Sequence, residues 1–307
     1  MKLGVALSGG GIRGIAHAGA LKALEDNNIK IDIIGGTSAG AMISTLYAMG
    51  YTPYYIYMLF KRYAKEIIGY ANVPIIFGVK KFVASKKLKV IGEDIGNLLE
   101  KEYVRLAKNK GIKNIRDINT MPIVIPAVDV QESKEYIFTN IVPKNNKKNN
   151  YITEIPIGKA VRASSSFPGV FSPCKYKHYK FIDGGVLNNV PVAEVKKQGA
   201  DKVIAINFKA DDIDETSNMM DLGMRTIDIM GNKISEENLS QSDFVLTIQT
   251  DKTGLLDIEK LDSCYKYGYQ AVIDNLDLIK KLLYLNIGGW EAGTHSLYLW
   301  YFSNWWI

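Results

Sequence analysis

The chain has 307 residues, of which 47% are hydrophobic and 23% charged, so it can bury a sizeable core and is not disordered. Its net charge of +6 is modest and no recognition module is visible, so a nucleic-acid partner is not expected. No apolar run approaches the roughly 20 residues that span a bilayer. Two cysteines, Cys174 and Cys264, are too few for a disulfide framework and suit a reducing compartment.

Apolar, strand-like runs recur along the chain and are mostly separated by helix-like segments. They lie at Leu3 to Leu7, Ile31 to Ile34, Ile123 to Val128, Val203 to Asn207 and Phe244 to Ile248. Strands that alternate with helices favour a parallel sheet covered on both faces. The sequence therefore predicts an α/β fold, a three-layer α/β/α sandwich around a largely parallel sheet.

A glycine-rich loop, Ser8 to Gly14, follows the first strand and opens a helix-like stretch from Ile15. It fits the dinucleotide pattern GxGxxG, in which Asp32, eighteen residues beyond Gly14, would bind a ribose hydroxyl. Consecutive glycines also let several N–H groups point one way, as an oxyanion hole requires. The loop alone leaves both interpretations open.

The segment from Gly36 to Gly40 places Ser38 between the β-branched run that ends at Ile34 and a small-residue helix that Gly50 closes. This strand, turn and helix context is typical of a nucleophile elbow, where the two glycines allow close backbone approach and the serine hydroxyl stands at a helix N-terminus. The alternative is an ordinary turn rich in small residues. The pattern makes Ser38 the candidate nucleophile.

A third motif is Asp183-Gly184-Gly185, at the end of the short apolar strand that contains Phe181. By itself Asp-Gly is a common turn. Together with the elbow and the glycine loop it completes a different set: donors for an oxyanion, a nucleophile and a carboxylate that accepts its proton. A dehydrogenase needs neither of the last two, so the three motifs together favour acyl transfer.

The chain resembles the patatin-like phospholipase family, whose signature is this trio in this order. The resemblance covers Gly9-Gly10-Gly11-Ile12-Arg13-Gly14, Gly36-Thr37-Ser38-Ala39-Gly40, Ala163-Ser164-Ser165-Ser166-Phe167-Pro168-Gly169-Val170-Phe171 and Asp183-Gly184-Gly185. It implies a lipid acyl hydrolase with a catalytic Ser38 and Asp183, an oxyanion hole in the Gly9 to Gly14 loop, a lipid substrate, and no metal or cofactor. A nucleotide-binding protein that uses the glycine loop is the alternative function.

Three histidines are present: His17, His178 and His295. The chain order Ser38, Asp183, His295 matches the order of a conventional α/β-hydrolase triad, which stays an alternative. The elbow comes too early for that fold, and His295 lies in an unusual terminal segment, so a Ser-Asp dyad is preferred. In such a dyad a poorly solvated carboxylate can have its pKa raised toward working pH. His17 and His178 are expected in packing or solvated roles.

Composition changes near Gly288, and all four tryptophans follow it. We therefore expect a hydrolase domain over residues 1–287 and a Trp-rich tail of unknown role over 288–307. Between Tyr54 and Val90, basic residues interleave with aromatic ones, which suits either a membrane-surface contact or a solvated cap. The first strand begins almost at Met1, so no signal peptide is expected. The location would be cytoplasmic or peripheral to a membrane, signal-less secretion stays open, and the sequence does not give the oligomeric state.

Overall fold

The computed structural model describes residues 1–71, 84–144, 150–168, 170–209, 219–251, 253 and 258–284. The Trp-rich tail of residues 288–307, with His295, lies outside the described residues. Among the helices within those ranges, none combines the length and the apolar character that a bilayer span requires.

Nine strands within the described residues form one sheet, in the order β5-β4-β3-β2-β1-β8-β9, with β7 paired to β3 and β6 to β7. Five neighbouring strands run parallel: β3 (Ile123–Asp129), β2 (Ile33–Gly36), β1 (Leu3–Leu7), β8 (Lys202–Phe208) and β9 (Phe244–Ile248). The others are β4 (Lys134–Thr139), β5 (Tyr151–Ile152), β6 (Cys174–Tyr176) and β7 (Tyr179–Asp183), of which β4 and β7 run antiparallel to β3. The predicted strands are confirmed, with small shifts at their ends.

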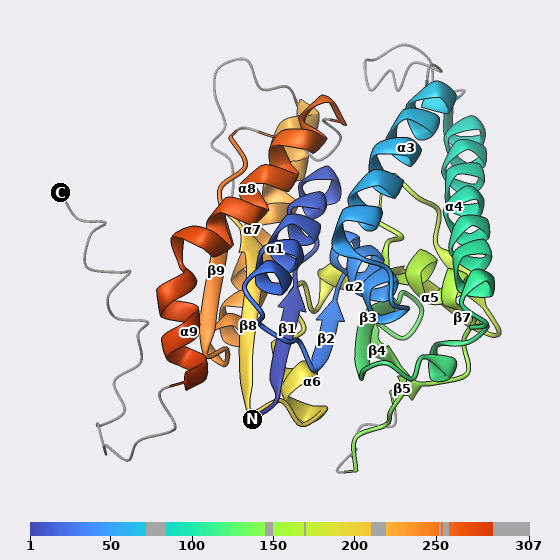
Figure 1. Ribbon diagram of the computed structural model, residues 1–307. Coiled ribbons are helices and arrows are strands. Elements are labelled where there is room, and N and C mark those ends of the chain that lie inside the picture. Colours follow the sequence, from blue (N-terminus) through green and yellow to red (C-terminus); the bar gives the residue numbers. More distant parts are fainter. Residues whose placement is uncertain are drawn as a thin grey trace.

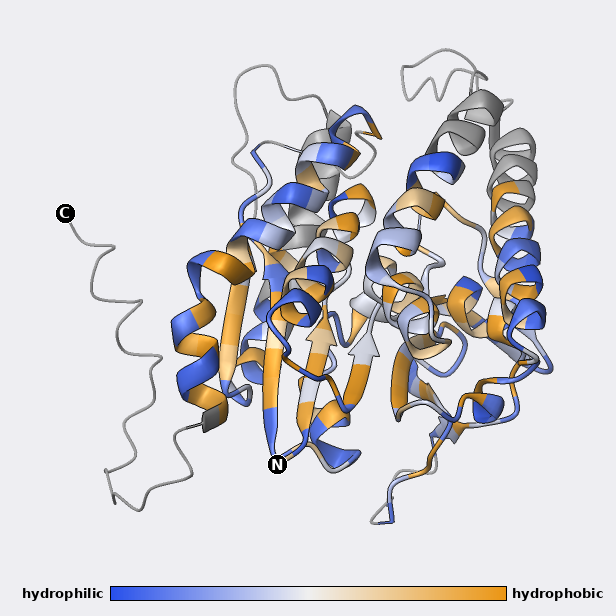
Figure 2. Ribbon diagram, viewed as in Figure 1, coloured by the Kyte–Doolittle hydropathy of each residue, from blue (hydrophilic) through white to orange (hydrophobic). Residues whose placement is uncertain are grey.

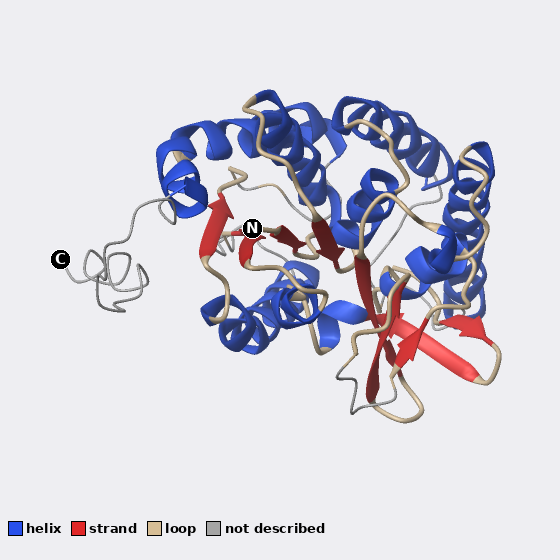
Figure 3. Cartoon of the chain, turned by 60° about the horizontal axis from the view of Figure 1, so that its bottom comes forward, coloured by secondary structure: helices blue, strands red, loops and turns tan. Residues whose placement is uncertain are grey.

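Helices cover both faces of this sheet (Figures 1 and 3). In chain order they are α1 (Ile15–Asp26), α2 (Ala39–Ala48), α3 (Pro53–Ala71), α4 (Ala84–Asn109), α5 (Ile157–Ser164), α6 (Val192–Lys197), α7 (Met219–Ser240), α8 (Leu261–Asp274) and α9 (Leu276–Tyr284). Helix α1 packs against α8 and α3 on one face, whereas α6 contacts β1, β2 and β8 on the other. The predicted three-layer α/β/α sandwich is therefore confirmed.

The strands separate two cores because alternate side chains point to opposite faces of a sheet. In β1, Val5 and Leu7 belong to the larger core beneath α1, α2 and α8, while Ala6 between them belongs to the smaller core with Val192 and Val195 of α6. Figure 2 shows hydrophobic, orange segments along the strands of the sheet. This double burial explains why the strands read as continuous apolar runs in the sequence.

Strands β2 and β7 meet end to end along the same edge of β3. Near the start of β3, Gly35 of β2 pairs with Val124, whereas Asp183 of the opposed strand β7 pairs with Ala127. Those two β3 positions are three residues apart, or about 10 Å at the rise of a strand. The carboxyl ends of β2 and β7 therefore face each other across a short gap, and each ends in one of the predicted site motifs.

Candidate active site

Ser38 occupies the turn between β2 and α2 in a strained backbone conformation, with φ 55° and ψ −119°. Few residues other than glycine adopt such angles, which cost of order 1–3 kcal/mol and persist only where the surroundings enforce them. Ser38 is also the residue that precedes the first turn of α2. Its hydroxyl therefore stands where the positive end of the helix dipole favours developing negative charge.

Two glycines make this turn sterically possible. A Cβ on Gly36 would lie 2.3 Å from the carbonyl oxygen of Gly40, and one on Gly40 would lie 2.5 Å from the carbonyl oxygen of Leu7. Side chains cannot approach backbone that closely, so both positions require glycine. The elbow predicted from Gly36 to Gly40 is thus observed as a turn that packs on the end of β1.

Three serines at the end of α5 hold the elbow and connect it to β7. The Ser38 N–H donates to Ser164 Oγ at 3.1 Å, and Ser165 Oγ donates to the Ser38 carbonyl at 3.3 Å. The carbonyl of Ser166 accepts the N–H of Asp183 at 3.1 Å. One short segment of the chain therefore fixes both the serine turn and the end of β7.

Asp183 ends β7 with only 2% of its surface exposed. Its Oδ1 accepts the Gly185 N–H at 2.8 Å, while within the described residues its buried Oδ2 has no partner of ordinary hydrogen-bond geometry. Burial raises the pKa of Asp183 to about 6, against the opposing effects of the neighbouring Ser38 hydroxyl and the Gly185 N–H. The serine is thus close enough to influence the carboxylate, and such contacts often tighten only when substrate binds.

Gly184 and Gly185 have different roles in this turn. A Cβ on Gly184 would lie 2.4 Å from the Pro126 carbonyl oxygen of β3, so glycine is needed for close packing there. Gly185 supplies the N–H that binds Asp183. The Asp-Gly-Gly motif is therefore a turn, as its composition suggests, that also holds a buried carboxylate in place.

The glycine loop lies directly against the elbow. A Cβ on Gly9 would be 3.2 Å from Ser38 Cβ, and one on Gly14 would be 2.4 Å from Ala39 Cβ. Gly11 has a left-handed φ of 57° and starts a short 3-10 turn, Gly11–Gly14. Two residues of the predicted oxyanion set, Gly9 and Gly14, thus pack against the elbow, and Gly11 between them has a backbone conformation that larger residues disfavour.

Not every predicted donor of this loop is available. The Gly9 N–H already donates to Asn189, to the carbonyl oxygen at 3.2 Å and to Oδ1 at 3.0 Å. Within the described part of the chain, the N–H groups of Gly10 and Gly11 have no such acceptor. Within the described residues the Gly10 and Gly11 amides are therefore unengaged, in a loop whose Gly9 and Gly14 pack against the elbow.

Arg13 holds the glycine loop through a contact with the Gly10 carbonyl. Its side chain is 5% exposed, its Nε donates to the Gly10 carbonyl at 3.4 Å, and its guanidinium lies 5.7 Å from the centre of the Phe208 ring. The same ring would contact a Cβ on Gly10 at 2.6 Å. Arg13 and Phe208 therefore fix the position of Gly10.

The described histidines take the packing and solvated roles predicted for them. His17 is fully buried, its Nε2–H donates to the Ser8 carbonyl at 2.8 Å, and its ring packs against Phe208. Burial lowers the pKa of His17 to about 4, opposed by that hydrogen bond, so the ring is neutral at physiological pH. His178 is exposed in the turn between β6 and β7, beside Tyr179.

Asp32 does not lie where a dinucleotide-binding carboxylate would have to be. It precedes β2 at the amino edge of the sheet, where Oδ2 accepts the Leu3 N–H at 3.0 Å and Oδ1 pairs with Lys30. The glycine loop is at the opposite, carboxyl end of β1. A dinucleotide site at the glycine loop would therefore lack the carboxylate that binds the ribose hydroxyl.

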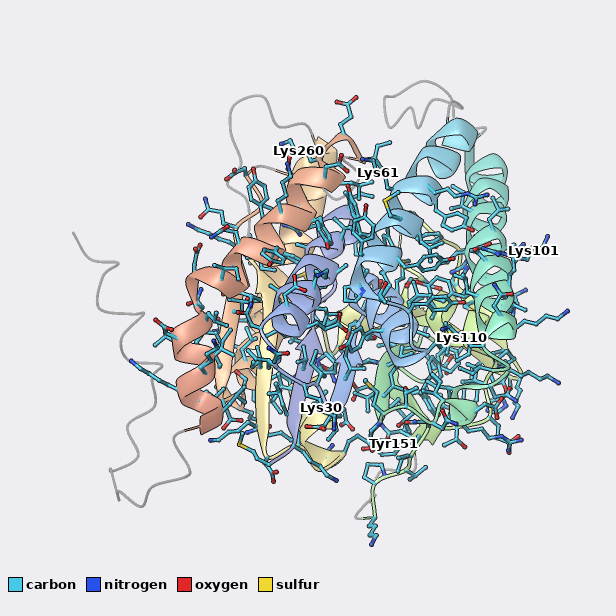
Figure 4. All side chains as sticks on the ribbon, viewed as in Figure 1. Lys30, Lys61, Lys101, Lys110, Tyr151 and Lys260 are labelled. Atoms are coloured by element: carbon cyan, nitrogen blue, oxygen red, sulfur yellow. The ribbon has the colours of Figure 1, made fainter. Side chains whose placement is uncertain are left out.

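Only the start of the basic and aromatic stretch between Tyr54 and Val90 has described side chains. Lys80 and Lys81 lie outside the described residues, as do the side chains of Lys86 and Lys87. In the described part of α3, Tyr54 is 55% exposed. Lys61, labelled in Figure 4, pairs through Nζ with Asp262 Oδ2 of α8 at 2.5 Å. The start of this stretch therefore exposes an aromatic ring, while one of its cations is paired to a neighbouring helix.

Sequence reasoning missed the polar pair Asn188 and Asn189. Thr37 of the elbow donates its hydroxyl to the Asn188 carbonyl at 2.8 Å, and Asn189 accepts the Gly9 N–H. The available signal was the position of two asparagines just beyond Asp-Gly-Gly and before the buried Val190. Nothing in the sequence indicated which loops they would join.

The fold and the site together define a class: a largely parallel α/β sheet with a serine at the strained turn after a central strand and a buried carboxylate beside it. The chain belongs to the patatin-like phospholipase family, which matches residues 5–196. Lysophospholipase NTE1 of Meyerozyma guilliermondii is 26% identical over 297 residues, which is 87% of this chain and 19% of that protein. YqhO of Bacillus subtilis is 29% identical over 208 residues, 66% of this chain and 69% of that one.

Among solved structures, VipD from Legionella pneumophila aligns with a TM-score of 0.49 at 14% identity, over 90% of this chain and 67% of that one. The chain spans about a fifth of the length of the NTE1 relatives that it matches.

Proposed function

We propose that this chain is a lipid acyl hydrolase that cleaves fatty-acyl esters of phospholipids or lysophospholipids through a Ser38-Asp183 dyad. The observation that carries the proposal is the pairing of a strained, helix-capping Ser38 with a buried Asp183, one of whose carboxylate oxygens has no ordinary hydrogen-bond partner within the described residues. Membership of the patatin-like phospholipase family supports this substrate class. So do the relatives named lysophospholipases, of which the chain matches only a part.

In the first half-reaction, Asp183 takes the proton of the Ser38 hydroxyl as Oγ attacks the ester carbonyl carbon. The tetrahedral oxyanion is stabilised by the N–H groups of Gly10 and Gly11 and by the N-terminus of α2. When the intermediate collapses, the C–O bond to the alcohol breaks, and the alcohol leaves with the proton from Asp183. Ser38 then carries the fatty acid as an ester.

In the second half-reaction, water attacks the acyl carbon and gives its proton to Asp183. The second tetrahedral intermediate uses the same two amides and releases the fatty acid, while Ser38 regains its proton from Asp183. No metal or cofactor is needed for either step. A pKa of about 6 suits this role because Asp183 is then ionised at neutral pH yet basic enough to hold a proton in transit.

We further propose that the lipid is taken from a membrane surface by peripheral contact, with the basic and aromatic stretch from Tyr54 to Val90 against anionic head groups. Such contact weakens as salt rises, because exposed charges are screened within about 10 Å at 0.1 M. Sedimentation with vesicles of graded phosphatidylglycerol content would measure it. Binding that depends on neither head-group charge nor salt would contradict the proposal.

Hydrolysis by wild type and Ser38→Ala tests the function most directly. Ser38→Ala should lose release of fatty acid from phospholipid and lysophospholipid vesicles and should no longer be labelled by a fluorophosphonate probe. Ser44→Ala is the matched control, because Ser44 lies in the same helix, α2, and its hydroxyl donates to the Ala41 carbonyl of that helix, its one partner within the described residues. A wild type without hydrolysis or labelling would overturn the proposal, as would a Ser38→Ala variant that kept either.

A further inference from the structure

The segment from Gly184 to Val190 contacts all three parts of the site. Its first contact is the Gly185 N–H to Asp183 Oδ1, at 2.8 Å. Its second is the Asn188 carbonyl, which accepts the Thr37 hydroxyl next to Ser38. Its third is Asn189, which accepts the Gly9 N–H at the start of the glycine loop. This segment therefore sets how the base, the nucleophile turn and the glycine loop lie relative to one another.

The contact with Gly9 differs from the other two because a side chain and its own backbone accept the same hydrogen. The Asn189 carbonyl lies 3.2 Å and the Asn189 Oδ1 3.0 Å from Gly9 N. The same Oδ1 is 2.6 Å from where a Gly9 Cβ would stand and 3.1 Å from the corresponding position at Gly185. The Asn189 side chain is thus lodged between the glycine loop and the Asp-Gly-Gly turn.

The direction of the Gly9 N–H constrains the peptide groups that follow. With that N–H turned toward Asn189, the chain continues through an extended φ of 165° at Gly10 to the left-handed Gly11. Glycines have no side chain to restrict such a loop, so an outside contact must select one of its many conformations. The amides left unengaged by this arrangement, within the described residues, are those of Gly10 and Gly11.

We propose that Asn189 is a positioning residue for the oxyanion hole: by binding the Gly9 N–H, its side chain holds the Gly10 and Gly11 N–H groups in place beside Ser38. The inference rests on the proposed function, because it assigns a role within the same reaction. A neutral amide suits this position. A carboxylate would accept the same hydrogen but would bring a negative charge close to the developing oxyanion.

Asn189→Ala tests this role, with Asn140→Ala as the matched control. Asn140 Oδ1 also accepts a backbone N–H at 3.0 Å, that of Ile123, but at the amino end of β3, away from the site. The kcat of Asn189→Ala on a soluble ester should fall about 10- to 100-fold, because a misplaced oxyanion donor weakens binding of the transition state. KM should change little, since that interaction is absent from the bound ester. Asn140→Ala should keep both parameters.

Amide hydrogen exchange measures the proposed contact independently of enzymatic activity. Exchange of a peptide covering residues 5–15 should accelerate in Asn189→Ala and stay unchanged in Asn140→Ala. Asn189→Asp should retain slow exchange, because its carboxylate still accepts the Gly9 N–H, yet lose at least about tenfold in kcat through its charge. The Asp variant keeps the experiment informative if Asn189→Ala does not fold.

The possible results separate this inference from the proposed function. An active and labelled wild type in which Asn189→Ala and Asn140→Ala have equal kcat would overturn the role of Asn189 alone. Rapid exchange in Asn189→Asp, or slow exchange in a folded Asn189→Ala, would do the same. A wild type without hydrolysis or labelling would overturn the proposed function and this role together.

Discussion

The end of β7 and the first turn of α1 each bury one titratable side chain close to the same glycine loop and elbow, and burial acts on the two in opposite directions. It raises the pKa of Asp183 to about 6 and lowers that of His17 to about 4. In both cases the neutral form is favoured because a charge is poorly solvated there. The carboxylate thereby becomes a base near neutral pH, while the imidazole becomes an uncharged packing group.

Their hydrogen bonds complete the difference. His17 uses its single N–H on the Ser8 carbonyl and so anchors the start of the glycine loop. Asp183 accepts only the Gly185 N–H by ordinary geometry among the described residues, and the nearby Ser38 hydroxyl lowers the pKa of its carboxyl group. Within the described residues each group keeps one buried atom without a partner, Nδ1 of His17 and Oδ2 of Asp183, so the difference between them is the direction of the pKa shift and the Ser38 hydroxyl near the carboxylate.

Asp183→Asn should have the largest effect of the variants at these two side chains, because it removes the base while keeping its shape. The rate of ester hydrolysis should fall at least about 100-fold, the usual cost of losing a general base. Steady-state kinetics on a soluble ester measure it, with Ser44→Ala as the control. Retention of more than about a tenth of the wild-type rate would show that Asp183 is not the base.

The pH dependence of ester hydrolysis should separate the titration of Asp183 from that of His17. Because Asp183 must be ionised to accept the proton, kcat/KM should be level above pH 7 and fall about tenfold per unit below pH 6. His17 stays neutral through that range and should add no second step. A profile that is flat down to pH 5 would contradict the assignment of Asp183.

The same titration predicts a change in stability. A buried carboxyl whose pKa is higher in the folded state than the ordinary 3.8 makes the free energy of unfolding decrease as pH rises from about 4 to 6. The decrease is about 3 kcal/mol, since a tenfold difference in proton affinity between the folded and unfolded states corresponds to about 1.4 kcal/mol. Asp183→Asn should lack this decrease, which urea unfolding at a series of pH values would measure.

His17→Gln should have the smallest effect. A glutamine amide can still donate to the Ser8 carbonyl, so the start of the glycine loop should stay in place while the packing against Phe208 is weakened. We expect a lower melting temperature and less than about a tenfold loss of kcat, well short of the loss of a general base. A loss as large as that of Asp183→Asn would give His17 a part in the chemistry.

Much of the site could be predicted because its motifs are local. Gly36 and Gly40 are required by contacts within one turn and the end of β1, and that requirement is visible as a five-residue pattern. The strand that ends in Asp183 was equally visible. By contrast, Ser164 and Asn189 act through contacts with residues 126 and 180 positions away in the chain, and no local pattern encodes such a pairing.

Local patterns in the sequence predicted the five parallel strands, the glycine loop, the serine turn and the carboxylate at a strand end, because periodicity and turn chemistry act over a few residues. They did not predict β4 or β5. Strand pairing in the folded chain makes β2 and β7 meet end to end on β3, which brings Ser38 and Asp183 together. It also places Asp32 at the far edge of the sheet, away from the glycine loop. The physical reason is that strand pairing and burial are long-range: they fix which loops meet, how each charge is solvated and therefore which group can react.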